Sequence, residues 1–169
     1  MTAERRCRAR ARPRGRGFTF IELVITLAIL GVLALMALPF AELTVKRTKE
    51  QELRTALRQI RTALDDYKKG VDEGRVPRKA DESGYPPSLD VLVEGVADPK
   101  DPSGKRRFYF LRRMPRDPMA EDGSVPAAST WGLRSYESSY DAPRPGRDVF
   151  DVYSTAEGVG LNGVPYRQW

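Results

Sequence analysis

A nearly uninterrupted apolar run, residues 18–40, constrains this chain more than any other feature. Its 23 positions contain a single charged side chain, Glu22. As an α-helix with a rise of about 1.5 Å per residue, the run can cross a hydrocarbon core of about 30 Å. The sequence therefore predicts a membrane-spanning helix, and the lone carboxylate near its start requires an explanation.

An arginine-rich leader, residues 1–17, precedes the apolar run. It holds seven of the 29 basic side chains and one of the 23 acidic ones, so the other 152 residues carry 22 of each sign. Removal of the leader would leave a formally neutral protein, for which no nucleic-acid partner is expected. By the positive-inside rule, these arginines hold the N-terminus in the cytoplasm.

The residue types that common catalytic sites use are scarce in this chain. Its only cysteine, Cys7, lies in the leader, and the sequence has no histidine. After the leader it offers neither a thiolate nor an imidazole for catalysis or metal binding. We therefore expect a protein that is not an enzyme and needs no cofactor.

The helical pattern continues over residues 41–72 but becomes one-sided. Apolar side chains recur with a period of 3.6 residues, which predicts a helix that packs one face on a sheet. These are Leu53, Ala56, Leu57, Ile60, Ala63, Leu64, Tyr67 and Val71. Glu50 and Arg54 have the spacing of an exposed i,i+4 ion pair. Gly70 and Gly74 indicate the end of the helix.

Residues 73–169 form the predicted head. A loop over 74–87 is followed by a short helix, 89–94, which Ser88 can cap. Three runs rich in β-forming residues, 108–111, 131–136 and 149–153, predict a small antiparallel sheet. Asn162-Gly163 predicts a tight turn before a last extended segment that ends at Trp169. The fold class is therefore α+β, with a long N-terminal helix packed on this sheet.

Two features of the head have the form of ligand sites. Residues 158–163 match the G-x-G-x-x-G fingerprint, but no strand–turn–helix context surrounds them, so we interpret them as a glycine-rich turn. Several aspartates could supply oxygen ligands, although their spacing is not that of a calcium loop. These are Asp117, Asp122, Asp141, Asp148 and Asp151.

The junction between the leader and the apolar run resembles the class III signal of type IV pilins and pseudopilins. The residues that carry the resemblance are the basic leader, Gly17, Phe18 and Glu22, the fifth residue after Gly17. In that family a prepilin peptidase cuts after the glycine and methylates the new N-terminal phenylalanine. The resemblance thus implies that Gly17 is the cleavage residue, Phe18 the methylated residue and Glu22 the acid needed for assembly.

Electrostatics are consistent with that role for Glu22. A carboxylate gains from the positive end of a helix dipole, yet it is costly in an apolar environment unless it is paired. Cleavage after Gly17 creates an α-ammonium group that, on a neighbouring subunit, can neutralise Glu22 and set the register between helices. An acid that extends to the membrane interface without a function is the alternative.

Two residues can make the apolar helix flexible. Pro39 removes one backbone hydrogen bond, and Gly31 weakens the helix eight residues earlier. The segment between them could bend or partly melt when helices leave lipid and pack into a filament. A kink that is simply tolerated in lipid explains the two residues equally well.

The head resembles one subfamily, the major pseudopilins of type II secretion (protein G). Residues 111–118, Leu-Arg-Arg-Met-Pro-Arg-Asp-Pro, are similar to its L-x-x-L-P-x-D-P signature, with Met114 in place of leucine. Better-known members carry an acidic calcium loop before the last tryptophan, whereas this chain has Leu-Asn-Gly-Val-Pro-Tyr at residues 161–166. That difference argues against calcium, and Asp148 and Asp151 are the metal candidates that remain.

The resemblance implies a single-pass inner-membrane protein with a periplasmic head, which polymerises into a pseudopilus that drives the export of folded proteins. The implied partners are further copies of the chain, prepilin peptidase, minor pseudopilins, an inner-membrane assembly platform and an assembly ATPase. Three alternatives stay open: a minor pseudopilin or surface type IV pilin, a membrane-anchored sensor or binding module, and, least favoured, an enzyme.

Overall fold

The computed structural model describes residues 17–79 and 81–169, and of residues 36–39 it describes the backbone but not the side chains. The leader before Gly17 therefore lies outside the described residues. The chain divides into two compact units, Met1–Leu43 and Thr44–Trp169. Helix α1, Phe20–Asp72, contributes to both units.

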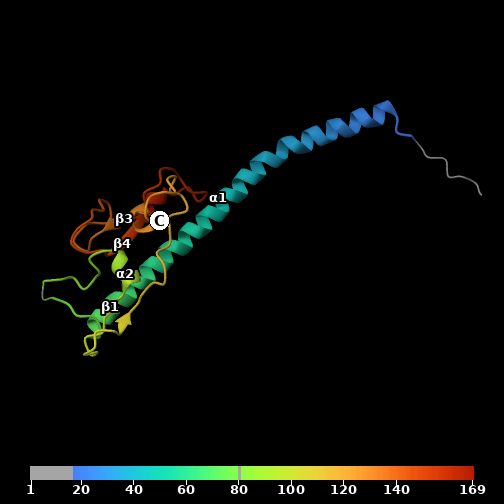
Figure 1. Ribbon diagram of the computed structural model, residues 1–169. Helices are drawn as coiled ribbons and strands as arrows, with labels where there is room; N and C mark the ends of the chain where they lie inside the picture. The colour runs from blue at the N-terminus through green and yellow to red at the C-terminus, as the bar shows by residue number, and fades with distance from the viewer. Residues whose placement is uncertain (1–16, 80) are drawn as a thin grey trace, which may run out of the picture. The chain divides into compact units, whose positions relative to one another are not determined.

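In the second unit, α1 packs against the head through the apolar face that its periodicity predicts. The eight predicted positions between Leu53 and Val71 are all at most 8% exposed. The rest of the core comes from the head: Val76, Leu89, Leu92, Trp131, Val149, Val152 and Tyr166. Within residues 44–169, the head elements lie along one side of α1 (Figure 1). The predicted amphipathic helix is confirmed.

A glycine ends α1 in the way that helices commonly end. Gly74 has φ +69°, a conformation that favours glycine. The amide of Gly74 donates to the carbonyl of Val71, and the amides of Arg75 and Val76 donate to the carbonyl of Gly70. The predicted stop near Gly70 and Gly74 is confirmed, with the last helical residue at Asp72.

Two small antiparallel sheets take the place of the single predicted sheet. In the first, β1 (Val96–Ala97) pairs with β2 (Arg107–Phe108). In the second, β3 (Trp131–Arg134) pairs with β4 (Asp151–Ser154), with Trp131 opposite Ser154. The antiparallel arrangement is confirmed, but the prediction of one sheet is wrong.

The strands are shorter than predicted because neighbouring amides bond elsewhere. The amides of Phe110 and Leu111 donate to the carbonyl of Leu92, so β2 ends at Phe108. The amide of Val149 donates to the carbonyl of Pro86, and β4 begins only at Asp151. These partners are distant in the sequence, and local β-propensity does not reveal them.

The short helices also differ from the predictions. Helix α2 spans Asp90–Glu94, and its N-cap is Leu89 with no side-chain cap, so the predicted capping by Ser88 is wrong. Segment η1, Ala127–Thr130, is a 3₁₀-helix just before β3. The turn at Asn162-Gly163 is confirmed by φ +78° at Gly163. The segment after the turn is a 3₁₀-helix, η2 (Tyr166–Gln168), and not an extended strand.

Candidate functional site

The first candidate region is the start of α1, where a threonine caps the helix. Gly17, Phe18 and Thr19 are not helical, and α1 begins at Phe20. The amide of Glu22 donates to the Thr19 hydroxyl at 3.3 Å. Thr19 is thus the N-cap and Glu22 the third helical residue, as in the T-x-x-E capping box. The sequence interpretation missed Thr19, although this four-residue signature could have revealed it.

The structure brings the three predicted junction residues to one end of α1. Glu22 lies in the first helical turn, where the positive end of the helix dipole favours a carboxylate. Phe18 is 80% exposed. A Cβ added at Gly17 would meet no atom within 4 Å. Packing among the described residues therefore does not explain why glycine stands at position 17.

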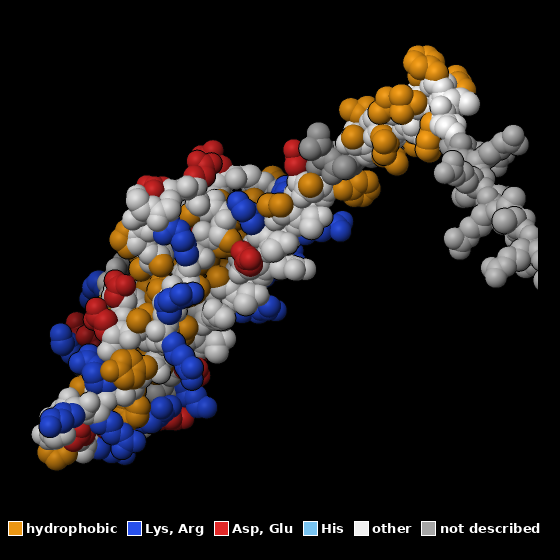
Figure 2. Space-filling model, turned by 45° about the vertical axis from the view of Figure 1, so that its right-hand side comes forward, with side chains coloured by type: hydrophobic (Ala, Val, Ile, Leu, Met, Phe, Trp, Pro, Cys, Tyr) orange, Lys and Arg blue, Asp and Glu red, His pale blue; other side chains and the backbone are white. Residues whose placement is uncertain are grey.

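The apolar side chains that follow are uncovered within the first unit. An 18-residue window of α1 has a mean hydropathy of 2.6, and none of that window is buried. The large hydrophobic side chains of residues 20–35 have exposed fractions from 44% at Val24 to 82% at Phe20. Hydrophobic side chains cover this part of the helix in Figure 2. An apolar surface of this size marks a membrane or assembly contact.

Gly31 lies inside this exposed helix, and a Cβ added there would meet no atom within 4 Å. The backbone of α1 continues through both Gly31 and Pro39, whose side chain is not among those described. The role of these two residues in helix flexibility stays a prediction.

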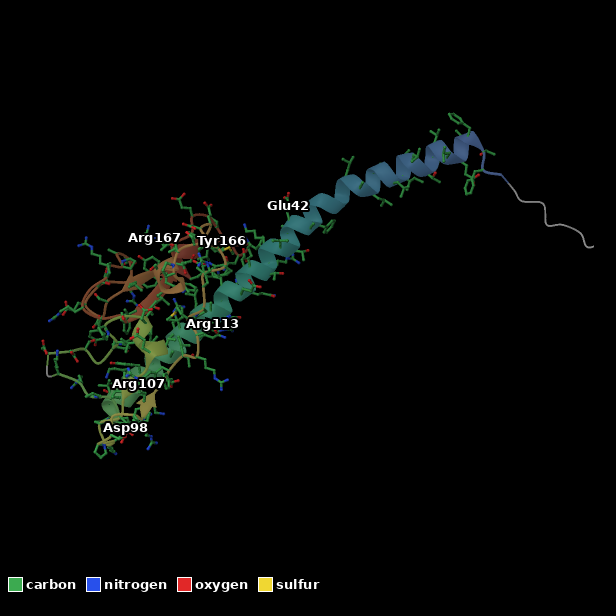
Figure 3. The ribbon with its side chains drawn as sticks, viewed as in Figure 1. Glu42, Asp98, Arg107, Arg113, Tyr166 and Arg167 are labelled. Atoms are coloured by element: carbon green, nitrogen blue, oxygen red, sulfur yellow. The ribbon has the colours of Figure 1, made fainter. Side chains whose placement is uncertain are left out.

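The second candidate region consists of Lys46, Glu50 and residues 158–166, and we call it the head anchor. It holds the C-terminal loop on α1. One carboxylate oxygen of Glu50 accepts hydrogen bonds from the amide of Leu161 at 2.8 Å and from the hydroxyl of Tyr166 at 3.0 Å. The Lys46 ammonium donates to the carbonyl of Val159 at 3.0 Å. Tyr166 is labelled in Figure 3.

The role of Glu50 corrects the sequence interpretation. Glu50 is 5% exposed, so it is not half of a solvent-exposed pair with Arg54. The Arg54 guanidinium instead lies over the ring of Trp169, 4.4 Å from its centroid. Burial, followed by the hydrogen bond to Glu50, raises the pKa of Tyr166. No local sequence signal pointed to this contact, because its partners are more than 100 residues apart.

Both remaining metal candidates accept hydrogen bonds from protein groups. Asp151 accepts from the side chains of Arg61 at 2.8 Å and Arg134 at 3.1 Å. Asp148 accepts from the Ser83 hydroxyl and, at 2.9 Å, from the amide of Tyr136. Among the described residues, no group of three or more potential side-chain ligands gathers. The structure therefore shows what these carboxylates bind within the chain and leaves the calcium prediction untested.

The glycine-rich segment 158–163 is a turn, as predicted. The amide of Gly163 donates to the carbonyl of Gly160, and Val159 forms a bridge with Pro165. A Cβ added at Gly160 would lie 2.4 Å from the ring of Trp169. Close packing on this tryptophan explains the glycine at position 160.

The signature at residues 111–118 ties its loop to β3 and β4. The indole N–H of Trp131 donates to the carbonyl of Pro115 at 2.9 Å. The Ser154 hydroxyl and the Met119 amide donate to the two oxygens of Asp117, which is 1% exposed. Asp117, one of the predicted oxygen ligands, thus serves as a buried acceptor that holds the signature against the second sheet.

Residues 12–38 match the prokaryotic N-terminal methylation motif. Type II secretion system core protein G of Pectobacterium carotovorum subsp. carotovorum is 31% identical over 149 residues, which cover 88% of this chain and 77% of that protein. The same protein of Klebsiella pneumoniae is 30% identical over 152 residues, with 88% and 86% covered. The chain belongs to the core protein G family of type II secretion systems.

The core protein G of Aeromonas hydrophila is also similar, with 30% identity over 147 residues that cover 86% of this chain and 82% of that protein. No solved structure matches the chain. Membership confirms the predicted recognition and the α+β pilin-like fold. The chain is a pseudopilin subunit, and its methylation motif and exposed apolar helix indicate a membrane-anchored protein.

Proposed function

We propose that this pseudopilin is cut by prepilin peptidase after Gly17 and methylated on Phe18. The exposed positions of both residues support this proposal, since an enzyme must reach them. So does the space around Gly17, which no other described residue fills, because a glycine that their packing does not require is consistent with recognition by another protein.

The mature subunit is held in the inner membrane with its N-terminus in the cytoplasm and its head in the periplasm. It then polymerises, with minor pseudopilins, into a filament that drives the export of folded proteins. An assembly ATPase and an inner-membrane platform supply the force, and the subunit itself catalyses nothing. The observation that carries this proposal is the uncovered apolar half of α1, which needs lipid before assembly and other helices afterwards.

The mass of the mature N-terminus tests the proposal. We expect a chain that begins at N-methylated Phe18 when the full sequence is expressed with a prepilin peptidase, and the intact precursor when the peptidase is absent. A purified membrane form that retains the leader in both cases would contradict the proposal and favour a membrane-anchored binding module.

The proposal includes no cofactor, because Lys46 and Glu50 fasten the loop that calcium would otherwise order. Both residues contact that loop directly, at 3.0 Å and 2.8 Å. We expect the unfolding temperature of the mature protein to be the same with calcium and with a calcium chelator. A clear upward shift with calcium, absent with magnesium, would restore the metal to the proposal.

A further inference from the structure

The C-terminal loop, residues 158–165, exposes three aliphatic side chains. Val159 is 48%, Leu161 44% and Val164 37% exposed. Among the described residues of the second unit, the other large hydrophobic side chains with this exposure are Val45 and three tyrosines. Tyrosine can direct its hydroxyl to water, whereas valine and leucine cannot. Among the described residues of this unit, the exposed large aliphatic side chains are thus Val45 and the three in the loop.

The loop is fixed to the part of α1 that carries Val45. Lys46, the next residue, donates to the carbonyl of Val159, and Glu50 accepts from the amide of Leu161. The amide of Gly160 also donates to the carbonyl of Val164 within the loop. These bonds hold the loop against the first two turns of α1 within the second unit.

Chain connectivity keeps this surface near the end of the apolar run. Lys46 follows Phe40, the last residue of that run, by six positions. Six helical residues span about 9 Å, similar to the headgroup layer of about 5–8 Å on each side of a bilayer. Because the loop is bonded to Lys46 and Glu50, it lies within reach of the lipid headgroups if residues 18–40 span the membrane as proposed.

The charges beside the loop favour an anionic surface. Three basic residues, Lys46, Arg47 and Lys49, follow within ten positions of Phe40, together with two acids, Glu42 and the buried Glu50. Arg47 and Lys49 are exposed. The same face of a second copy would present the same excess of positive charge and would be repelled. Aliphatic side chains beside lysine and arginine are typical of protein surfaces that lie in the interface of a membrane.

We propose that residues 158–165, with Val45, Arg47 and Lys49, form a docking surface for the anionic headgroups and upper acyl chains of the membrane that holds the subunit. The docked loop orients the head on the bilayer before assembly and is released when the subunit enters the filament. This inference rests on the proposed membrane anchoring through α1.

Nitroxide labels on the full chain can test the docking in nanodiscs that hold one copy each. With Cys7→Ser to remove the native thiol, a label is attached at Leu161→Cys, at Leu30→Cys within the apolar run, or at Arg113→Cys, an exposed position on the head. Oxygen relaxes labels in lipid, and a water-soluble nickel chelate relaxes labels in water. In discs of phosphatidylglycerol and phosphatidylethanolamine, we expect oxygen to relax labels 30 and 161 more strongly than nickel does. We expect nickel to relax label 113 more strongly than oxygen does. In the outcomes below, a label is said to favour the reagent that relaxes it more strongly.

Charge variants make the test quantitative. Arg47→Gln should lower the docked-to-free ratio of label 161 about fivefold, which corresponds to about 1 kcal/mol per basic residue at an anionic surface. Arg58→Gln is the matched control and should have no effect, because it lies about 16 Å further along α1, beyond the screening length of about 8 Å.

Each other outcome would overturn the inference in an identifiable way. If label 161 favours nickel while label 30 favours oxygen, the anchor is in lipid and the docking is wrong. If label 161 is shielded from nickel only in discs with several copies, the loop belongs to a contact between subunits. If label 30 itself favours nickel, the proposed anchoring fails as well.

Discussion

Glu50 joins segments of the chain that lie 111 and 116 residues apart in the sequence. Its side chain is almost fully buried, and the two groups that it accepts from belong to the C-terminal loop and to η2. A buried donor that loses its acceptor costs more than the bond itself contributes, because the donor has already left water. Two of the hydrogen bonds that hold the C-terminal segment on α1 thus depend on one carboxylate.

Glu50→Ala should lower the free energy of unfolding by about 1–3 kcal/mol, because the Tyr166 hydroxyl loses its buried acceptor. Glu50→Gln should cost less, since the amide oxygen can still accept both bonds. Urea unfolding in detergent micelles, followed by tryptophan fluorescence, measures both variants. Equal losses in the two variants would show that negative charge, and not hydrogen bonding, is the important property.

The same contact predicts a loss of stability at alkaline pH. The pKa of Tyr166 is raised above its ordinary value of about 10, first by burial and then by Glu50. The folded state therefore favours the neutral phenol. Its contribution to stability is fully present below about pH 10 and is lost as the pH rises through the raised pKa.

Unfolding free energies measured from about pH 8 to about pH 12 check this prediction. Tyr166→Phe should be less stable at neutral pH, since it lacks the bond to Glu50, but should lose less stability above about pH 10. The pKa values of Tyr67 and Tyr85 are also raised by burial, and both residues are present in both proteins. Parallel pH profiles for the two proteins would refute the assignment to Tyr166.

The pairing of β3 with β4 depends on the absence of one side chain. Gly132 lies opposite Tyr153, and a Cβ at position 132 would lie 2.3 Å from the tyrosine ring. The ring thus covers the space where any other residue would place its side chain. Strands of four residues have few other contacts with which to maintain their register.

Gly132→Ala should therefore lower the free energy of unfolding by about 1–3 kcal/mol, because the ring of Tyr153 or the strand must move. Gly123→Ala is the matched control, since a Cβ there would meet no atom within 4 Å, and it should be nearly neutral. Urea unfolding compares the two variants. In the Gly132→Ala background, Tyr153→Ser should recover part of the loss, and no recovery would show that the ring is not the obstacle.

Helices were more predictable than strands in this chain for a physical reason. The buried apolar positions of α1 recur every 3.6 residues over many turns, so each of them is further evidence for the same helix. Strands of two to four residues carry no such repetition, and their ends depend on distant partners such as the carbonyls of Leu92 and Pro86. Long-range bonding, and not propensity, sets where these strands stop.

The two candidate regions differ in the same way. The junction was predicted from its resemblance to the pilin signal, whose residues Gly17, Phe18 and Glu22 lie close together in the sequence, and Thr19 could have been added from its capping signature. The head anchor was missed because the donors to the Glu50 carboxylate lie far along the chain, and the local spacing of Glu50 to Arg54 suggested a different partner. A contact between residues that are distant in the sequence cannot be detected in a short sequence window.

At the scale of the whole molecule, the two units bury their apolar side chains differently. The second unit buries most of its large apolar side chains, in a core that α1 shares with the head. The described apolar side chains of the first unit are exposed and must rely on lipid or on other subunits. Maturation and assembly should therefore depend on the first unit without disturbing the fold of the second.

Gly17→Ala and Glu22→Ala separate these two steps. Gly17→Ala should leave uncut precursor in the membrane, because cleavage is expected after a glycine. Glu22→Ala should be cut and inserted normally but should form no filament, since no carboxylate remains to neutralise the α-ammonium of a neighbouring Phe18. Intact mass reports cleavage, and sedimentation of sheared filaments reports assembly.

Glu22→Gln tests whether charge is the important property. The amide keeps the size and most of the hydrogen-bonding capacity of Glu22 but cannot neutralise a cation, so this variant should also be cut and should also fail to assemble. Glu52→Gln, an exposed acid on the same helix outside the apolar run, is the matched control and should assemble like the wild type. Normal filament yield from Glu22→Gln would show that the acid acts through shape or hydrogen bonding and would remove the charge-pairing mechanism.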